Sequence, residues 1–150
     1  MFQRDYLMRM IAELIDAVIR SIKRQYPDAK AAIQGIEGEI GRVTDSDHNL
    51  LLSMAPDSMV AYLDLGHFQA DSAEYVVRSL YYLSDLYAKQ GDHSSANLRA
   101  LQADKLSARY QLGIDASSAS ADQLEKFFAS PDDPSVEPDP QLSASSSQAD

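Results

Sequence analysis

The sequence predicts an all-α fold of antiparallel helical hairpins, followed by a disordered acidic C-terminal tail. Apolar residues recur at intervals of three or four through most of residues 1–115, which is the period of amphipathic helices. The residues that end helices and separate these stretches are Pro27, Pro56, Gly91 and Gly113. Past Asp115 serine, proline and acidic residues dominate, and such a composition buries too little apolar surface to fold. We therefore expect an all-helical domain over residues 1–115 and a mostly disordered tail over residues 116–150.

Composition limits the compartment and the partners. The 150 residues contain no cysteine, which fits a reducing compartment, so we expect the protein in the cytoplasm. Residues 1–10 lack the apolar run of a signal peptide, and no stretch approaches the roughly 20 apolar residues that a membrane span needs. The formal net charge is −10, whereas nucleic-acid binders carry a basic excess. We expect no nucleic acid among the partners.

A helix predicted over residues 2–26 carries a wide apolar surface. Its apolar positions are Leu7, Met8, Met10, Ile11, Leu14, Ile15, Val18, Ile19 and Ile22. They cover more than half of the circumference, so this helix needs partners on two sides. A second copy is one possible cover, and we predict a two-fold homodimer with Leu7, Ile11, Ile15 and Ile19 at the contact. The alternative is that the next helix and a helix over residues 57–66 cover both sides within one chain.

Pro27 ends the first helix and can open a second one. The buried stripe of this second helix is predicted at Ile33, Ile36, Ile40 and Val43. Three glycines inside it, at positions 35, 38 and 41, each cost about 1 kcal/mol relative to alanine, which indicates close backbone contacts or partial helicity. A phosphate-binding loop is not expected, because the spacing G-x-G-x-x-G is missing. Glu37 and Glu39 are expected to face solvent on different helix faces.

Residues 45–49, DSDHN, match the first three ligand positions of a calcium-binding loop. The match then fails, because Leu50 replaces the required glycine and Pro56 replaces the bidentate glutamate. We predict that these polar residues instead cap a helix from His48 to Met54. The helix over residues 57–66 follows, with Asp57 or Ser58 as its cap.

The most regular pattern is a helical hairpin over residues 71–112. Its first helix places Val76, Leu80, Leu83 and Tyr87 on one face, and its second places Ala96, Ala100, Ala103 and Leu106 on one face. Gly91 is expected to end the first helix at positive φ, and residues 92–94 to cap the second.

Residues 77–110 resemble one tetratricopeptide-type helical hairpin. The matching positions are Leu80, Leu83, Ser84, Tyr87, Gly91, Ala96, Ala100 and Ala103, of which Ser84 and Ala100 depart from the usual residue types. No second copy follows, so upstream helices or another subunit must complete the core of this hairpin. Residues 3–11 are similar to the start of a family of short bacterial helical proteins of unknown function, and this similarity implies no activity.

The tetratricopeptide resemblance implies a partner-binding groove along the first helix of the hairpin. The residues that share this face by their spacing are Arg78, Tyr81, Asp85, Ala88 and Lys89. Aromatic and charged residues on an exposed face suit the recognition of a protein or peptide. The alternative is that Tyr81 and the neighbouring Tyr82 fill core against another helix.

The tail is expected to stay unfolded beyond Ser130. Residues 121–129 are the exception, since Ser120 can cap a short helix there. Leu124, Phe127 and Phe128 would form its apolar face, and whether this face docks on the domain is left open. Removal of everything after Asp115 is expected to leave the fold intact.

The sequence offers no pattern of a catalytic or metal site. His48, His67 and His93 have no second histidine three or four residues away, so no helix presents a two-histidine metal face. The nucleophile motif G-x-S-x-G is also missing. We expect no enzymatic activity, no metal and no cofactor.

The favoured function is therefore a self-associating protein-interaction or assembly module. The alternative is a peripheral membrane-surface protein, because basic residues surround the apolar first helix: Arg4, Arg9, Arg20, Lys23, Arg24 and Lys30. Acidic residues dilute this basic face, and a net charge of −10 repels anionic lipid. A membrane surface is the less favoured partner.

Overall fold

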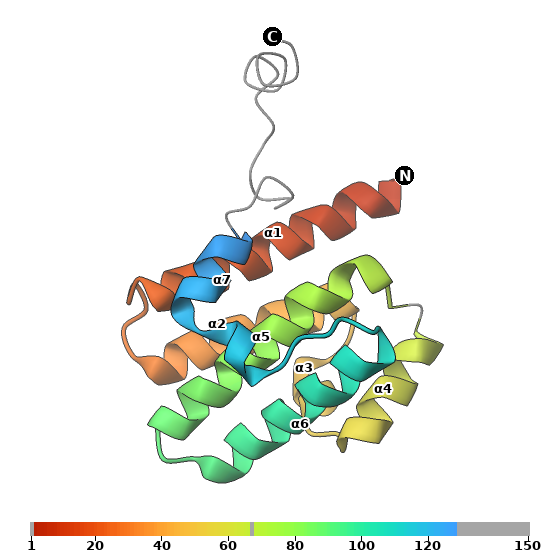
Figure 1. Cartoon of the computed structure of the whole chain (residues 1–150). Helices are drawn as coiled ribbons and strands as arrows, with labels where there is room; N and C mark the ends of the chain where they lie inside the picture. The colour runs from red at the N-terminus through yellow and green to blue at the C-terminus, as the bar shows by residue number, and fades with distance from the viewer. Residues whose placement is uncertain (1, 67, 129–150) are drawn as a thin grey trace, which may run out of the picture.

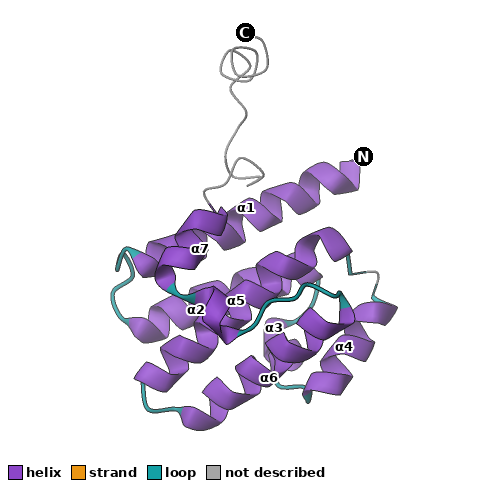
Figure 2. Ribbon diagram, in the orientation of Figure 1, coloured by secondary structure: helices purple, strands orange, loops and turns teal. Residues whose placement is uncertain are grey.

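Two helical hairpins pack against each other in the computed structural model, which describes residues 2–66 and 68–128 (Figure 1). The first hairpin consists of α1 (Phe2–Ile22) and α2 (Ala29–Thr44), and the second of α5 (Ala70–Lys89) and α6 (His93–Arg109). Between them lie α3 (His48–Leu52) and α4 (Pro56–Leu65), and after them come the 3-10 helix η1 (Ala116–Ala119) and α7 (Ala121–Phe128). The part of the chain that is described contains no strand, so the predicted all-α class is confirmed (Figure 2).

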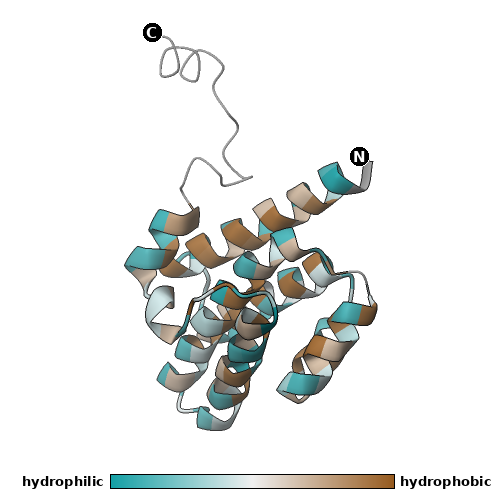
Figure 3. Ribbon diagram, turned by 45° about the vertical axis from the view of Figure 1, so that its right-hand side comes forward, coloured by the Kyte–Doolittle hydropathy of each residue, from teal (hydrophilic) through white to brown (hydrophobic). Residues whose placement is uncertain are grey.

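Helix α5 lies at the centre of the fold. It contacts α1, α2, α6 and η1, and most of its residues between Ser72 and Leu83 are buried. Val77, Leu80 and Leu83 are fully buried there, and the core continues into Leu14 of α1 and Ile36 of α2. Figure 3 shows apolar and polar residues alternating along the long helices, as amphipathic helices around a shared core require.

Local capping explains most helix boundaries. The side chain of Asp28 accepts a hydrogen bond from Ala31 N at 2.8 Å, and that of Asp92 accepts one from Ser95 N at 3.1 Å, so each satisfies an otherwise free N–H in the first turn of its helix. Gly91 ends the hairpin's first helix with φ +82°, which confirms the predicted positive φ.

Several boundaries differ from the sequence predictions, and α3, for example, ends at Leu52 rather than Met54. Helix α1 ends at Ile22 rather than Tyr26, because Arg24 adopts a left-handed conformation and Gln25 N donates to Arg20 O at 2.9 Å. Helix α6 ends at Arg109 rather than Leu112, before a left-handed Gln111. The predicted caps of α4 are wrong, since Pro56 is itself the first helical residue and its missing N–H needs no cap.

The wide apolar surface of α1 is covered within the chain. Helix α1 contacts α2, α5 and α7, which lie on different sides of it. Ile11 and Ile15, which were predicted at a dimer contact, are only 4% and 3% exposed. Leu7 and Ile19 are half-buried against the same core. Downstream helices therefore cover most of the apolar positions that motivated a dimer, whereas Met8 is 37% exposed, and the homodimer itself stays a prediction.

Residues 116–128, which we call the strap, fold back onto the two hairpins. The side chains of Leu124 and Phe128 are 0% and 1% exposed, and α7 lies against α1 (Figure 1). The helical structure therefore continues past Asp115, where the sequence analysis ended the domain, through α7 to Phe128. The predicted unfolded tail beyond Ser130 lies outside the described residues.

We predict that Phe128→Ala lowers the free energy of unfolding by about 3–5 kcal/mol, since it leaves a cavity under α7. The half-buried Phe127 is the matched control, and Phe127→Ala is expected to cost clearly less. Urea unfolding of the full chain measures both values. Removal of residues after Asp115 is now expected to lower the melting temperature by more than about 5 °C. Equal stability of wild type and Phe128→Ala would contradict the docked position of α7.

A second prediction concerns the backbone at Gly91. No atom would hinder a Cβ there, so backbone conformation alone decides the effect. Gly91→Val is expected to cost about 1–3 kcal/mol, because a β-branched residue is strained at positive φ. Gly91→Asn is the control and is expected to cost less, since asparagine tolerates this conformation. Thermal unfolding compares the two variants, and the same loss in both would argue against a left-handed Gly91.

Candidate functional site

An open groove of about 1020 Å³ lies beside the C-terminal half of α5. Four segments line it: the end of α1 with its loop, the first turn of α2, residues 81–89 of α5, and residues 116–121. The lining side chains are mostly small or apolar on the strap and α2, including Ala29, Ala32, Ala116, Ala119 and Ala121. Larger polar side chains come from α5 and from the loop after α1.

The loop after α1 owes its course to two local features. The left-handed Arg24 turns the chain away from the axis of α1, and Asp28 then caps α2, which begins at Ala29 and not at the predicted Pro27. Tyr26 of this loop packs on Gly35 of α2, where an added Cβ would come within 2.8 Å of the tyrosine oxygen. The glycine therefore creates the room for the Tyr26 ring at the edge of the groove. Partial burial raises the pKa of the Tyr26 hydroxyl.

The α5 wall of the groove combines an aromatic and a charged part. The hydroxyl groups of Tyr82 and Ser21 share a hydrogen bond of 2.8 Å, which ties α5 to α1, and burial raises the pKa of Tyr82. One turn further, Lys89 Nζ lies 3.0 Å from Asp85 Oδ2 on the exposed surface. This wall therefore presents one charge of each sign beside Tyr82, which is only 7% exposed.

Only some of the residues of the predicted partner-binding face line the groove. Asp85 and Lys89 are exposed and line the groove, as does the buried Tyr81. Tyr81 donates a hydrogen bond to Asp104 Oδ1 of α6 at 2.5 Å and is 4% exposed, so it also fills core, as the alternative interpretation held. Burial, followed by the bond to Asp104, raises its pKa. Arg78 lies outside the groove, because the strap covers it.

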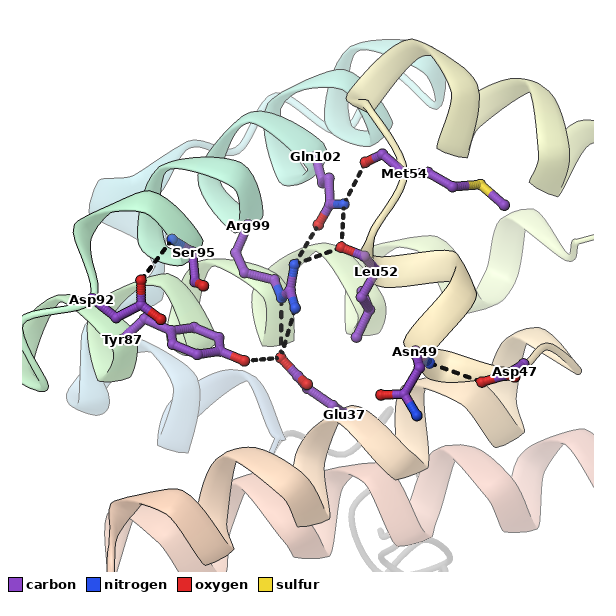
Figure 4. A network of polar contacts seen from close by, with 10 residues as sticks. All are labelled: Glu37, Asp47, Asn49, Leu52, Met54, Tyr87, Asp92, Ser95, Arg99 and Gln102. Carbon is purple, nitrogen blue, oxygen red and sulfur yellow. Dashed lines mark hydrogen bonds and ion pairs between the residues drawn. The ribbon is translucent and has the colours of Figure 1, made fainter.

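A buried polar network lies under the other side of the fold (Figure 4). Glu37 of α2 accepts hydrogen bonds from Arg99 Nη2 of α6 at 2.9 Å and from the hydroxyl of Tyr87 of α5 at 2.7 Å. Glu37 is 9% exposed and Arg99 is 7% exposed, so the pair is almost removed from water. Burial and the carboxylate of Glu37 together raise the pKa of Tyr87 to about 12.

The same network holds the end of α3. Arg99 Nη1 donates to Leu52 O at 2.8 Å, and the amide of Gln102 donates to Leu52 O at 3.0 Å and to Met54 O at 2.9 Å. The last carbonyl groups of a helix lack partners within the helix, so these two side chains satisfy them. Four helices are thereby joined through one set of hydrogen bonds.

Sequence reasoning did not find this network. Glu37 was expected in solvent, which is wrong, and Glu39 is half-buried. The sequence spacing could have revealed it, because Glu37 follows Ile33 by four positions and Arg99 follows Ala96 by three. Each charged residue therefore lies on the apolar stripe of its own helix. An acid and a base that both interrupt buried stripes indicate a buried ion pair.

The predicted capping role of the DSDHN segment is confirmed. Asp47 Oδ1 accepts a hydrogen bond from Asn49 N at 3.0 Å, and Asp45 ends α2 in a left-handed conformation (Figure 4). In the described part of the chain, no group of three or more histidine, aspartate or glutamate residues is arranged to hold a metal ion. His48 is half-buried and His93 is exposed at the start of α6, whereas His67 lies outside the described residues.

No protein-family model, no curated protein and no solved structure matches the chain. Within residues 2–66 and 68–128, no helix has the length and apolar character needed to cross a bilayer.

We predict strong coupling between Glu37 and Arg99. Glu37→Leu and Arg99→Met each leave a buried charge without its partner, so each should lower the free energy of unfolding by about 3–5 kcal/mol. The double variant removes both charges, and it should lose much less than the sum of the single losses. Urea unfolding of the four proteins measures this coupling. Additive losses would mean that the two side chains do not form a buried pair.

Proposed function

We propose that the protein is a non-enzymatic interaction module that holds a segment of a partner protein in the groove beside α5. The observation that carries this proposal is the groove itself, with Tyr26 and Tyr82 beside the Asp85–Lys89 pair. A volume of about 1020 Å³ exceeds what a small metabolite fills. An open groove with a tyrosine at its edge and charges at its rim suits a peptide, since tyrosines anchor protein contacts and rim charges orient them.

The position of α5 supports a binding role. A recognition surface works best on a rigid element, and α5 is held by α1, α2 and α6 on its other sides. The Glu37–Tyr87 hydrogen bond and the Ser21–Tyr82 hydrogen bond fix the groove half of α5 at two points. A partner therefore meets a preformed wall and does not have to order it, which lowers the entropic cost of binding.

The tetratricopeptide resemblance supports the same surface. Helices α5 and α6 join through a three-residue connection containing Gly91, and Ser84 Oγ donates to Ala96 O at 2.7 Å where the two helices lie close. In a tetratricopeptide hairpin the first helix lines the binding groove, and the groove here lies along the corresponding helix. Upstream helices, rather than further repeats, complete the core of this hairpin. A protein or peptide partner, met in the cytoplasm, fits this proposal better than nucleic acid.

Two other roles draw less support. A homodimer through α1 would need Ile11 and Ile15, which are buried within one chain. A membrane-surface role would need a free apolar face on α1, and the same burial leaves none along its centre. Light scattering at micromolar concentration tests the homodimer, since a monomer has a mass of 16.5 kDa and a dimer has twice that mass. Flotation with phosphatidylserine vesicles tests the membrane-surface role.

We predict that a random peptide library selected on the full chain yields peptides that bind in the groove. Ala88 lines the groove on α5 and is half-buried, so Ala88→Phe places a ring in the peptide's space. Selected peptides should bind this variant at least about tenfold more weakly, equal to about 1.4 kcal/mol. Fluorescence polarisation measures the affinities.

The matched control is Ala108→Phe, which adds the same ring at an exposed position of α6 outside the groove. Its affinity for the selected peptides should equal that of the wild type. A library without enriched sequences, or peptides that bind Ala88→Phe as tightly as the wild type, would contradict the proposed function.

A further inference from the structure

The strap covers one half of the predicted partner-binding face of α5, which runs from Arg78 to Lys89. The exposed half ends in Asp85 and Lys89, and the covered half contains Arg78. The side chain of Arg78 is only 12% exposed, because its Nη1 donates to Ser118 O at 3.0 Å and its guanidinium lies 4.3 Å from the centre of the Phe127 ring. One end of this helix face therefore lies in the open groove, and the other end is covered by the strap.

The strap contacts the hairpins as a short helical ligand contacts its receptor. Leu124 and Phe128 are buried, and the Phe128 ring lies parallel to Tyr75 of α5 with 6.1 Å between ring centres. The Phe127 ring packs on the same tyrosine at 5.1 Å. Apolar anchors at positions i, i+3 and i+4 of an amphipathic helix are the usual mode of helix recognition in a groove. The receptor side of this contact, which we call the seat, is formed by α1 and α5.

The connection to the strap suits an element that can leave its seat. Residues 110–115 join α6 to η1, and Gln111 and Gly113 both have positive φ. Ser107 Oγ donates to Ile114 O at 2.9 Å, Leu112 N donates to Ser107 O at 2.9 Å, and the Tyr110 ring packs on Phe68. Helix α7 has 8 residues, which is too short for a stable isolated helix. It therefore folds only on the seat, as a local unit separate from the two hairpins.

We infer that the seat is a second docking site, for an amphipathic helix of a partner protein, and that the strap is its internal occupant. The fitting partner carries leucine and two aromatic residues at positions i, i+3 and i+4, as α7 does with Leu124, Phe127 and Phe128. Residues 116–121 of the strap also form one wall of the groove. Exchange of the strap for a partner helix therefore opens the groove along this wall and leaves one face from Tyr75 to Lys89. This inference goes beyond the proposed function, in which the strap stays in place.

The test uses a labelled peptide of residues 114–128 with blocked ends, added to the full chain. In the released variant, the full chain carries Leu124→Asp and Phe128→Asp, so its own strap no longer fits the seat. The peptide should bind the released variant at least about tenfold more tightly than the wild type, because an occupied seat reduces the apparent affinity by the fraction that is open. Equal affinity for both proteins, or binding to neither, would overturn the inference.

Two controls locate the binding on the seat. A peptide with the same two aspartate substitutions should not bind. In the released variant, a further Arg78→Ala should weaken binding of the native peptide, whereas Arg109→Ala, which removes an arginine paired with Asp64 of α4, should not. Loss of binding in both arginine variants, or in neither, would place the peptide elsewhere.

Amide hydrogen exchange of the wild type, measured with and without the peptide, tests the same inference without the released variant. Saturating peptide should speed the exchange of the chain's own amides 118–128 and leave α5 and α6 protected. Unchanged exchange of residues 118–128 would overturn the inference. The ligand differs from the library peptides that test the groove, so the two proposals fail separately.

Discussion

The buried ion pair between Glu37 and Arg99 is the interaction on which the arrangement of the hairpins depends. It joins α2 to α6, takes in Tyr87 of α5, and through Gln102 fixes the end of α3. Two charges removed from water are costly unless every hydrogen-bonding group is satisfied, and this requirement permits only one register between the helices. Apolar packing alone tolerates sliding and repacking. We therefore expect the network to contribute to the specificity of the fold and the core to supply most of its stability.

This network and the core hold α5 from its other sides, and the remaining side of that helix makes the contacts outside them. That side carries the groove at one end and the strap at the other. The chemistry of the two ends explains why the strap covers only one of them. Two phenylalanines and a leucine find apolar area near Tyr75, whereas the C-terminal end of α5 presents the Asp85–Lys89 pair, which stays hydrated.

Sequence periodicity located all of the long helices, and glycine and aspartate located their ends where the caps are local. Gly91 and Asp92 are examples, since each acts on backbone groups within three residues. What the periodicity left undecided has one cause. Ile11 and Ile15 have the same apolar character whether a second copy or α2 and α5 cover them, so the sequence could not choose between dimer and monomer core. The docking of α7 likewise depended on a receptor surface that only the assembled hairpins create.

The sequence by itself determined the helical class, the hairpin turn at Gly91 and the composition of the face from Arg78 to Lys89, because these depend on spacing along one helix. Only the tertiary structure decided which part of that face is open. It also decided that Glu37 is buried and not solvated, since its partner Arg99 lies 62 positions away. Interactions between distant positions carry no period in the sequence. They arise when the hairpins pack, and it is there that the candidate site is formed.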